Sequence, residues 1–227
     1  MRFQDAARDG RAVVYAAIQA ESVVARAAGL LADASQGQRV LGRAVMNGET
    51  IDPVAWRAMF PTLFGLDAGA DPVTLARSEA ILAVSLEVAD RGDQVRSQVR
   101  GAIVEAVTAV LLARRAGDAA VRRERRILFD GVRAEIHPYD VTVERDGAAE
   151  AFDCKWGARG INADVLHQLD DARGHAAEED QPLRVALVVF DAERSCRVRL
   201  ERQTAPFAGT DLIALESLDR LATGARS

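Results

Sequence analysis

Cysteine and aromatic residues are scarce in this sequence of 227 residues. It contains two cysteines, Cys154 and Cys196, and aromatic residues make up 5% of it. Two cysteines so far apart form neither a CxxC pair nor the repeated spacing of a zinc site, so the sequence predicts no disulfide framework and no cysteine zinc site. A reducing, cytoplasmic environment fits this usage. Few aromatics with abundant alanine and arginine favour helices that pack through small side chains.

Long apolar runs and export signals are also missing. No apolar run reaches the roughly 18 residues that a membrane-spanning helix needs, and residues 1–10 are polar and mixed in charge. The sequence therefore predicts no membrane segment and no signal peptide. It has no GxxxxGK[ST], GxGxxG, HExxH or GxSxG motif, so nucleotide-driven, dinucleotide-binding, zinc-protease and serine-hydrolase functions lack their starting residues.

The chain has no excess of positive charge. Its net charge of -5 argues against a protein that coats nucleic acid by bulk attraction, because that binding needs many cations. A local basic stretch nevertheless lies between Arg114 and Arg133. Either it is a solvated helix end with its loop, or it contacts nucleic acid. The candidate contacts are Arg122, Arg123, Arg125 and Arg126.

Apolar spacing changes along the chain and predicts two parts. Residues 5–91 show helical periodicity, and Asp-Pro pairs at 52–53 and 71–72 predict helix starts. Residues 1–92 are therefore predicted to form an all-helical domain. From residue 93 onward the pattern predicts a helix (93–115), three strands (127–129, 134–143 and 149–156), a helix (162–178) and a buried strand (183–190). Residues 196–200 and 212–215 are candidate further strands, so 93–227 is predicted to be an α/β domain.

A tight turn predicts the register of the second and third strands. Asp146-Gly147 between alternating runs is a strong hairpin signal, and a primed two-residue turn requires positive φ at both positions. If Arg145 faces Ala148, counting places Asp140 opposite Asp153. Side chains alternate along a strand, so Lys155 shares their face. The other face is predicted to carry Tyr139, Val141, Val143, Phe152, Cys154 and Trp156.

Two facing aspartates repel each other unless a cation lies between them. A hard divalent cation held by carboxylate and carbonyl oxygens would resolve the conflict. The alternative is a half-exposed hairpin in which Lys155 simply forms a salt bridge with either aspartate, and the sequence leaves it open. Cys154 is predicted to be a core thiol on the packed face.

Two short motifs follow the apolar helix that carries Glu105. They are Pro138-Tyr139-Asp140 and Asp153-Cys154-Lys155. This arrangement resembles the PD-(D/E)XK nuclease superfamily, which has the restriction-endonuclease-like fold. The resemblance covers residues 93–215 and includes the element order αβββαβ. It departs from the family pattern at Tyr139, which separates the proline from the aspartate. It implies that Asp140, Asp153, the backbone carbonyl of Cys154 and Glu105 hold Mg²⁺ or Mn²⁺.

The same resemblance implies that Lys155 orients or activates the attacking water, and that Gln168 lies near the scissile phosphate. Its implied activity is metal-dependent hydrolysis of phosphodiester bonds, most often in DNA, with RNA open as a substrate. Restriction, defence against foreign DNA and repair are the expected roles. The helical domain is then expected to bind a protein partner, form a homodimer or recognise substrate. A catalytically inactive adaptor and a purely structural helical oligomer are the alternatives.

Overall fold

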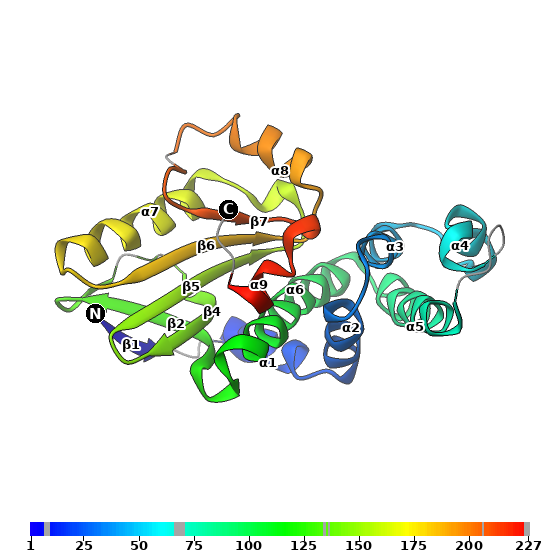
Figure 1. Cartoon of the computed structure of the whole chain (residues 1–227), viewed down its shortest axis with the longest axis horizontal. Helices are drawn as coiled ribbons and strands as arrows, with labels where there is room; N and C mark the ends of the chain where they lie inside the picture. Colours follow the sequence, from blue (N-terminus) through cyan, green and yellow to red (C-terminus); the bar gives the residue numbers. More distant parts are fainter. Residues whose placement is uncertain (7–9, 66–70, 134, 136, 206, 225–227) are drawn as a thin grey trace. The chain divides into compact units, whose positions relative to one another are not determined.

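The computed structural model describes residues 1–6, 10–65, 71–133, 135, 137–205 and 207–224 (Figure 1). The chain forms two compact units, one made of Met1–Ala12 with Thr108–Ser227 and the other of Val13–Val107. This division differs from the predicted domains 1–92 and 93–227. The chain passes between the units inside helix α6 (Asp93–Ala116), and the first residues belong with the sheet because they form its strand β1 (Arg2–Asp5).

The unit Val13–Val107 is helical, as its sequence predicts. The side chains of Asp52 and Asp71 accept hydrogen bonds from the first backbone N–H groups of α4 and α5, each of which begins with proline. A capping box between Ser35 and Gln38 starts α3. The helices are α1 (Gly10–Gln19), α2 (Ser22–Ala32), α3 (Gln36–Asn47), α4 (Pro53–Met59), η1 (Pro61–Leu63), α5 (Pro72–Ala89) and the first part of α6.

The other unit is built on one mixed sheet, so the α/β class is confirmed. Its seven strands within the described residues follow the order β1-β2-β4-β5-β6-β7, with β3 paired to β2. The pairs from β1 to β5 are antiparallel, whereas β6 runs parallel to β5 and β7. The strands after β1 are β2 (Val121–Phe129), β3 (Val132–Arg133), β4 (Tyr139–Arg145), β5 (Ala148–Lys155), β6 (Leu183–Val189) and β7 (Asp211–Ile213).

Helices of this unit cover both faces of the sheet. Ala151 of β5 packs with Leu166 and Leu169 of α7 (Ala163–Glu178), which lies along the sheet in Figure 1. The neighbouring Glu150 points to the opposite face and pairs with Arg115 of α6. The remaining helical elements of the unit are η2 (Asp118–Ala120), η3 (Ala158–Gly160), α8 (Glu193–Leu200), η4 (Leu215–Ser217) and α9 (Arg220–Thr223).

Two secondary-structure predictions are wrong. Residues 121–126, predicted as a connection between the helix (93–115) and the strand (127–129), begin strand β2, because β1 and β4 flank this arginine-rich segment and Asp5 and Glu144 pair with Arg125. Residues 196–200, predicted as a strand, lie in helix α8, where Glu193 and Arg197 pair at the i,i+4 spacing of a helix.

The described residues include no single helix with the length and apolar character to cross a membrane. The bent pair Ala12–Gln19 and Ser22–Ala32 meets that test of length and composition only when its helices are taken together.

Candidate functional site

The hairpin of β4 and β5 has the predicted register, from Arg145 opposite Ala148 to Val141 opposite Phe152. The predicted turn geometry is wrong at one position. Gly147 has a φ of 76°, but Asp146 is not among the residues with positive φ. The register is still as predicted because the turn has two residues, and their number sets which strand residues face each other.

The regular pairing of β4 with β5 ends at Val141, one residue short of Asp140, so the predicted pair of Asp140 with Asp153 lies just outside it. An Asp140 carboxylate oxygen, Oδ2, accepts a hydrogen bond from the backbone N–H of Cys154 at 2.6 Å. Tyr139 breaks the predicted alternation, because its hydroxyl donates to the Gln168 carbonyl of α7 at 3.3 Å and its ring joins the core beneath α7. Its predicted place on the face of Cys154 is therefore wrong. The hydrogen bond between the Cys154 N–H and the Asp140 carboxylate lies next to this break in the side-chain alternation of β4.

The two aspartates and the lysine line a single cavity. Asp153 and Lys155 of β5 face α7, like Ala151 on the same strand. The Lys155 ammonium forms an ion pair with Asp153, of which 5% is exposed. The cavity, of about 260 Å³, is lined by His137, Pro138, Asp140, Asp153, Lys155, Asn162, Asp164, Val165 and Gln168. The sequence analysis predicted that Asp140, Asp153 and Lys155 share one face of the sheet, and the presence of all three in one cavity agrees with that prediction.

Lys155 is held as a cation. Burial alone would lower the pKa of its amine, but the charges of Asp153 and Asp140 more than offset this and raise the pKa above its usual value. Its alkyl chain passes close to Gly160, where an added Cβ would lie 3.0–3.1 Å from the lysine's carbon atoms. A side chain at position 160 would therefore crowd the lysine.

Cys154, between Asp153 and Lys155, points to the other face. Its sulfur lies 3.5 Å from the hydroxyl oxygen of Thr108 on α6, and the residue is buried. The prediction of a core thiol is confirmed. The part of its backbone carbonyl as a metal ligand stays a prediction.

Glu105 belongs to the helical unit and is 4% exposed. Its carboxylate accepts hydrogen bonds from the Tyr15 hydroxyl and, at 2.7 Å, from the Gln19 amide. Its predicted part in a metal site remains a prediction.

Glu124 of β2 is a site residue that the sequence analysis missed. It lies between Arg123, opposite Val141, and Arg125, opposite Tyr139, which places it level with Asp140. Carboxylate oxygens of Glu124 and Asp140 lie within 4.8 Å of each other. Its φ of 52° is unusual for a residue with a side chain and costs about 1 kcal/mol. Nothing in the sequence marks this position, because the run around it is dominated by arginine.

Replacing Glu124 with glycine is expected to raise the free energy of unfolding by up to about 1 kcal/mol, because glycine adopts positive φ without strain. Mn²⁺ affinity should fall if the carboxylate helps to hold a cation. Urea denaturation and calorimetric titration measure the two effects. The control is Arg122→Gly, an exposed change on the same strand, which should lower stability by about 0.5–1 kcal/mol. An equal loss of stability in both variants would contradict the strain assigned to Glu124.

Asp164 also lines the cavity and was not singled out from the sequence. It lies in the first turn of α7, whose N-cap Asn162 accepts a hydrogen bond from the N–H of Val165 at 3.0 Å. The asparagine is a recognisable helix-start signal. What the sequence lacks is any indication that this helix start lies against the end of β5.

The arginines proposed as nucleic-acid contacts occupy different environments. Arg125 pairs with Glu144 at 2.7 Å and with Asp5, and Arg126 lies 3.6 Å from Glu135. Arg122 is exposed and Arg123 is half-buried. The structure therefore assigns Arg125 and Arg126 to ion pairs within the sheet unit, and a nucleic-acid contact by any of the four stays a prediction.

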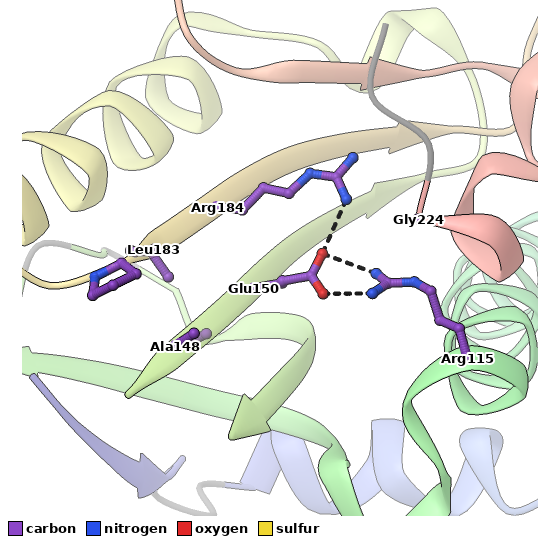
Figure 2. Close-up of a pocket in the computed structure, with 8 residues that line it drawn as sticks. Arg115, Ala148, Glu150, Leu183, Arg184 and Gly224 are labelled. Carbon is purple, nitrogen blue, oxygen red and sulfur yellow. Dashed lines mark hydrogen bonds and ion pairs between the residues drawn. The ribbon is translucent and has the colours of Figure 1, made fainter. Parts of the chain in front are cut away.

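A second cavity, of about 340 Å³, lies near the starts of β5 and β6 (Figure 2). Arg115 contacts both carboxylate oxygens of Glu150 at 2.7 and 2.8 Å, and Arg184 contacts one of them at 3.0 Å. Arg184 also pairs with Asp211 at 2.6 Å. Because these guanidinium groups already contact carboxylates, the network joins α6, β5, β6 and β7 rather than offering open charge to a ligand.

Comparison with known proteins gives no match to a family model, to a curated protein or to a solved structure. The interpretation of the site therefore depends on its own residues and their geometry.

Proposed function

We propose that this chain is a metal-dependent nuclease of the PD-(D/E)XK kind, which hydrolyses phosphodiester bonds. The observation that carries the proposal is the convergence of Asp140, Asp153 and Lys155 on one cavity at the ends of adjacent strands. With the two-residue strand β3 and the short helices η2 and η3 left aside, the element order is α6-β2-β4-β5-α7-β6, which supports the proposal because it has the αβββαβ order of that superfamily.

The residues of the cavity fit a hard divalent cation. Asp140 and Asp153 provide carboxylate oxygens, which Mg²⁺ and Mn²⁺ prefer as ligands. These two carboxylates line one cavity with the Lys155 ammonium, and a divalent cation bound to their oxygens would add to the positive charge that stabilises them. Bound metal would polarise a phosphoryl oxygen and make hydroxide available near neutral pH. Glu124 is a further carboxylate within reach of Asp140, and Glu105 remains the proposed ligand from α6.

Lys155 has two roles in the proposed reaction. Its ammonium offsets the negative charge that develops on the phosphate as water attacks phosphorus and the bond to the leaving oxygen breaks. It also orients the attacking water by donating a hydrogen bond. The ion pair with Asp153 and the packing against Gly160 hold the amine in the cavity for both roles.

DNA is the proposed substrate, with RNA as the alternative polymer of the same chemistry. Restriction, defence against foreign DNA or repair in the cytoplasm is the proposed setting. We further propose that the unit Val13–Val107 binds a protein partner or a second copy of the chain. These assignments come from the resemblance of the motif and its element order.

The test is incubation of the protein with linear, circular, single-stranded and branched DNA and with RNA, in Mg²⁺ or Mn²⁺ and with chelator. We expect metal-dependent cleavage that Asp153→Asn abolishes. The matched control is Asp146→Asn, which makes the same change in the exposed turn of the same hairpin and should keep wild-type activity. Absence of cleavage of every substrate by the wild-type protein would favour the inactive adaptor.

A further inference from the structure

The side-chain amide of Gln168 is bonded to the backbone just before β4. The residue lies on α7 and is 4% exposed. Its Oε1 accepts a hydrogen bond from the His137 N–H at 3.2 Å, and its Nε2 donates to the His137 carbonyl at 3.1 Å. Only one orientation of the amide satisfies both bonds, so both ends of the side chain are engaged with a single backbone residue.

A third hydrogen bond joins the same two segments. The Tyr139 hydroxyl donates to the backbone carbonyl of Gln168 at 3.3 Å, and this contact is buried. The residues on either side of Pro138, His137 and Tyr139, therefore both form hydrogen bonds with Gln168 of α7. Pro138 has no N–H with which to hold the segment itself.

Asp140 directly follows residues 137–139, the segment that is hydrogen-bonded to Gln168. Regular pairing of β4 with β5 ends at Val141, whereas the pairing of β4 with β2 continues to Tyr139, so on the N-terminal side of Asp140 the sheet holds β4 from the β2 side. The Asp140 carboxylate contacts the Cys154 N–H, and the direction from which it reaches the cavity depends on the preceding residues. The hydrogen bonds at Gln168 add a second constraint on this segment, from the direction of α7.

We propose that Gln168 is a positioning residue, which acts through the backbone of His137 to place the Asp140 carboxylate for metal binding. This inference rests on the proposed function. The resemblance predicts that Gln168 lies near the scissile phosphate. We infer a positioning role in place of a direct phosphate contact, because the Gln168 amide is already hydrogen-bonded to the backbone of His137. Outer-shell residues of this kind orient metal ligands, and their loss typically lowers metal affinity about 10–100-fold.

The experiment is calorimetric titration of Mn²⁺ into the full chain without DNA, together with cleavage kinetics. Gln168→Met keeps the size of the side chain but removes both hydrogen bonds. It should weaken Mn²⁺ binding about 10-fold or more, leave KM for DNA unchanged and recover most of kcat at saturating Mn²⁺. The control is His167→Ala, an exposed change on the same helix, which should match wild type.

Tyr139→Phe provides a second variant, since it removes only the bond to the Gln168 carbonyl and keeps the buried ring. It should weaken Mn²⁺ binding by a smaller factor. Unchanged Mn²⁺ affinity in Gln168→Met, with kcat lowered at saturating metal, would overturn the inference in favour of a phosphate contact. Absence of Mn²⁺ binding by the wild-type protein would instead overturn the proposed function itself.

Discussion

Replacing Lys155 with methionine is expected to slow DNA cleavage by about 10²–10³-fold, because a preorganised charge beside the reacting phosphate is lost. Mn²⁺ binding should persist or tighten. In the wild-type protein the ammonium pairs with Asp153 and repels a cation in the same cavity, so its removal frees that carboxylate. Single-turnover cleavage at saturating Mn²⁺, with calorimetry for the metal, measures both effects.

The matched control is Arg159→Met, which removes an exposed positive charge from the turn that follows β5. It should cleave DNA at nearly the wild-type rate. Equal rates for wild type and Lys155→Met would contradict the role of the lysine and support the alternative in which it is only a salt-bridge partner.

Replacing Glu150 with alanine is expected to lower the free energy of unfolding by about 3–5 kcal/mol, because it leaves Arg115 and Arg184 without their shared carboxylate. Urea denaturation at pH 7 measures this change. The control is Glu193→Ala, which removes the exposed i,i+4 pair with Arg197 and should cost no more than about 0.5 kcal/mol. Equal, small effects in the two variants would contradict the structural role of the network.

The same carboxylate predicts a pH dependence. Burial alone would raise the pKa of Glu150, but the hydrogen bond and charge of Arg115, with the charge of Arg184, lower the pKa overall. A carboxyl whose folded-state pKa is depressed contributes stability that is present above its unfolded pKa and is lost as pH falls through the folded value. Wild type should therefore lose stability more steeply than Glu150→Ala below pH 4.5, the ordinary pKa of the group. If the free energy of unfolding fell equally steeply with decreasing pH in wild type and in Glu150→Ala, the lowered pKa of Glu150 would be contradicted.

The parts of the fold that local sequence determines could be predicted. The Asp146-Gly147 turn, with the number of residues between the strands, fixed which residues of β4 and β5 face each other. Asp52 and Asp71 before proline marked two helix starts. Alternation along β5 also placed Asp153 and Lys155 together, because neighbouring strand residues point to opposite faces.

The parts that depend on distant neighbours could not be predicted. Arg125 lies in a strand because β1 and β4 provide its partners, and no local pattern in the sequence reveals β1. Tyr139 leaves the alternation to reach α7, and Glu124 adopts a positive φ beside Asp140. The bonds between Gln168 and His137 likewise connect positions that are 31 residues apart. Such features follow from packing rather than from periodicity.

The central claim is that Asp140 and Asp153 hold a divalent cation beside Lys155. The most direct measurement is an anomalous difference map from crystals grown with Mn²⁺. The account predicts a peak in the cavity at the ends of β4 and β5, bonded to both carboxylates, and its loss in Asp140→Ala crystals. A map from well-diffracting wild-type crystals with no peak there, at a Mn²⁺ concentration that supports cleavage, would contradict it.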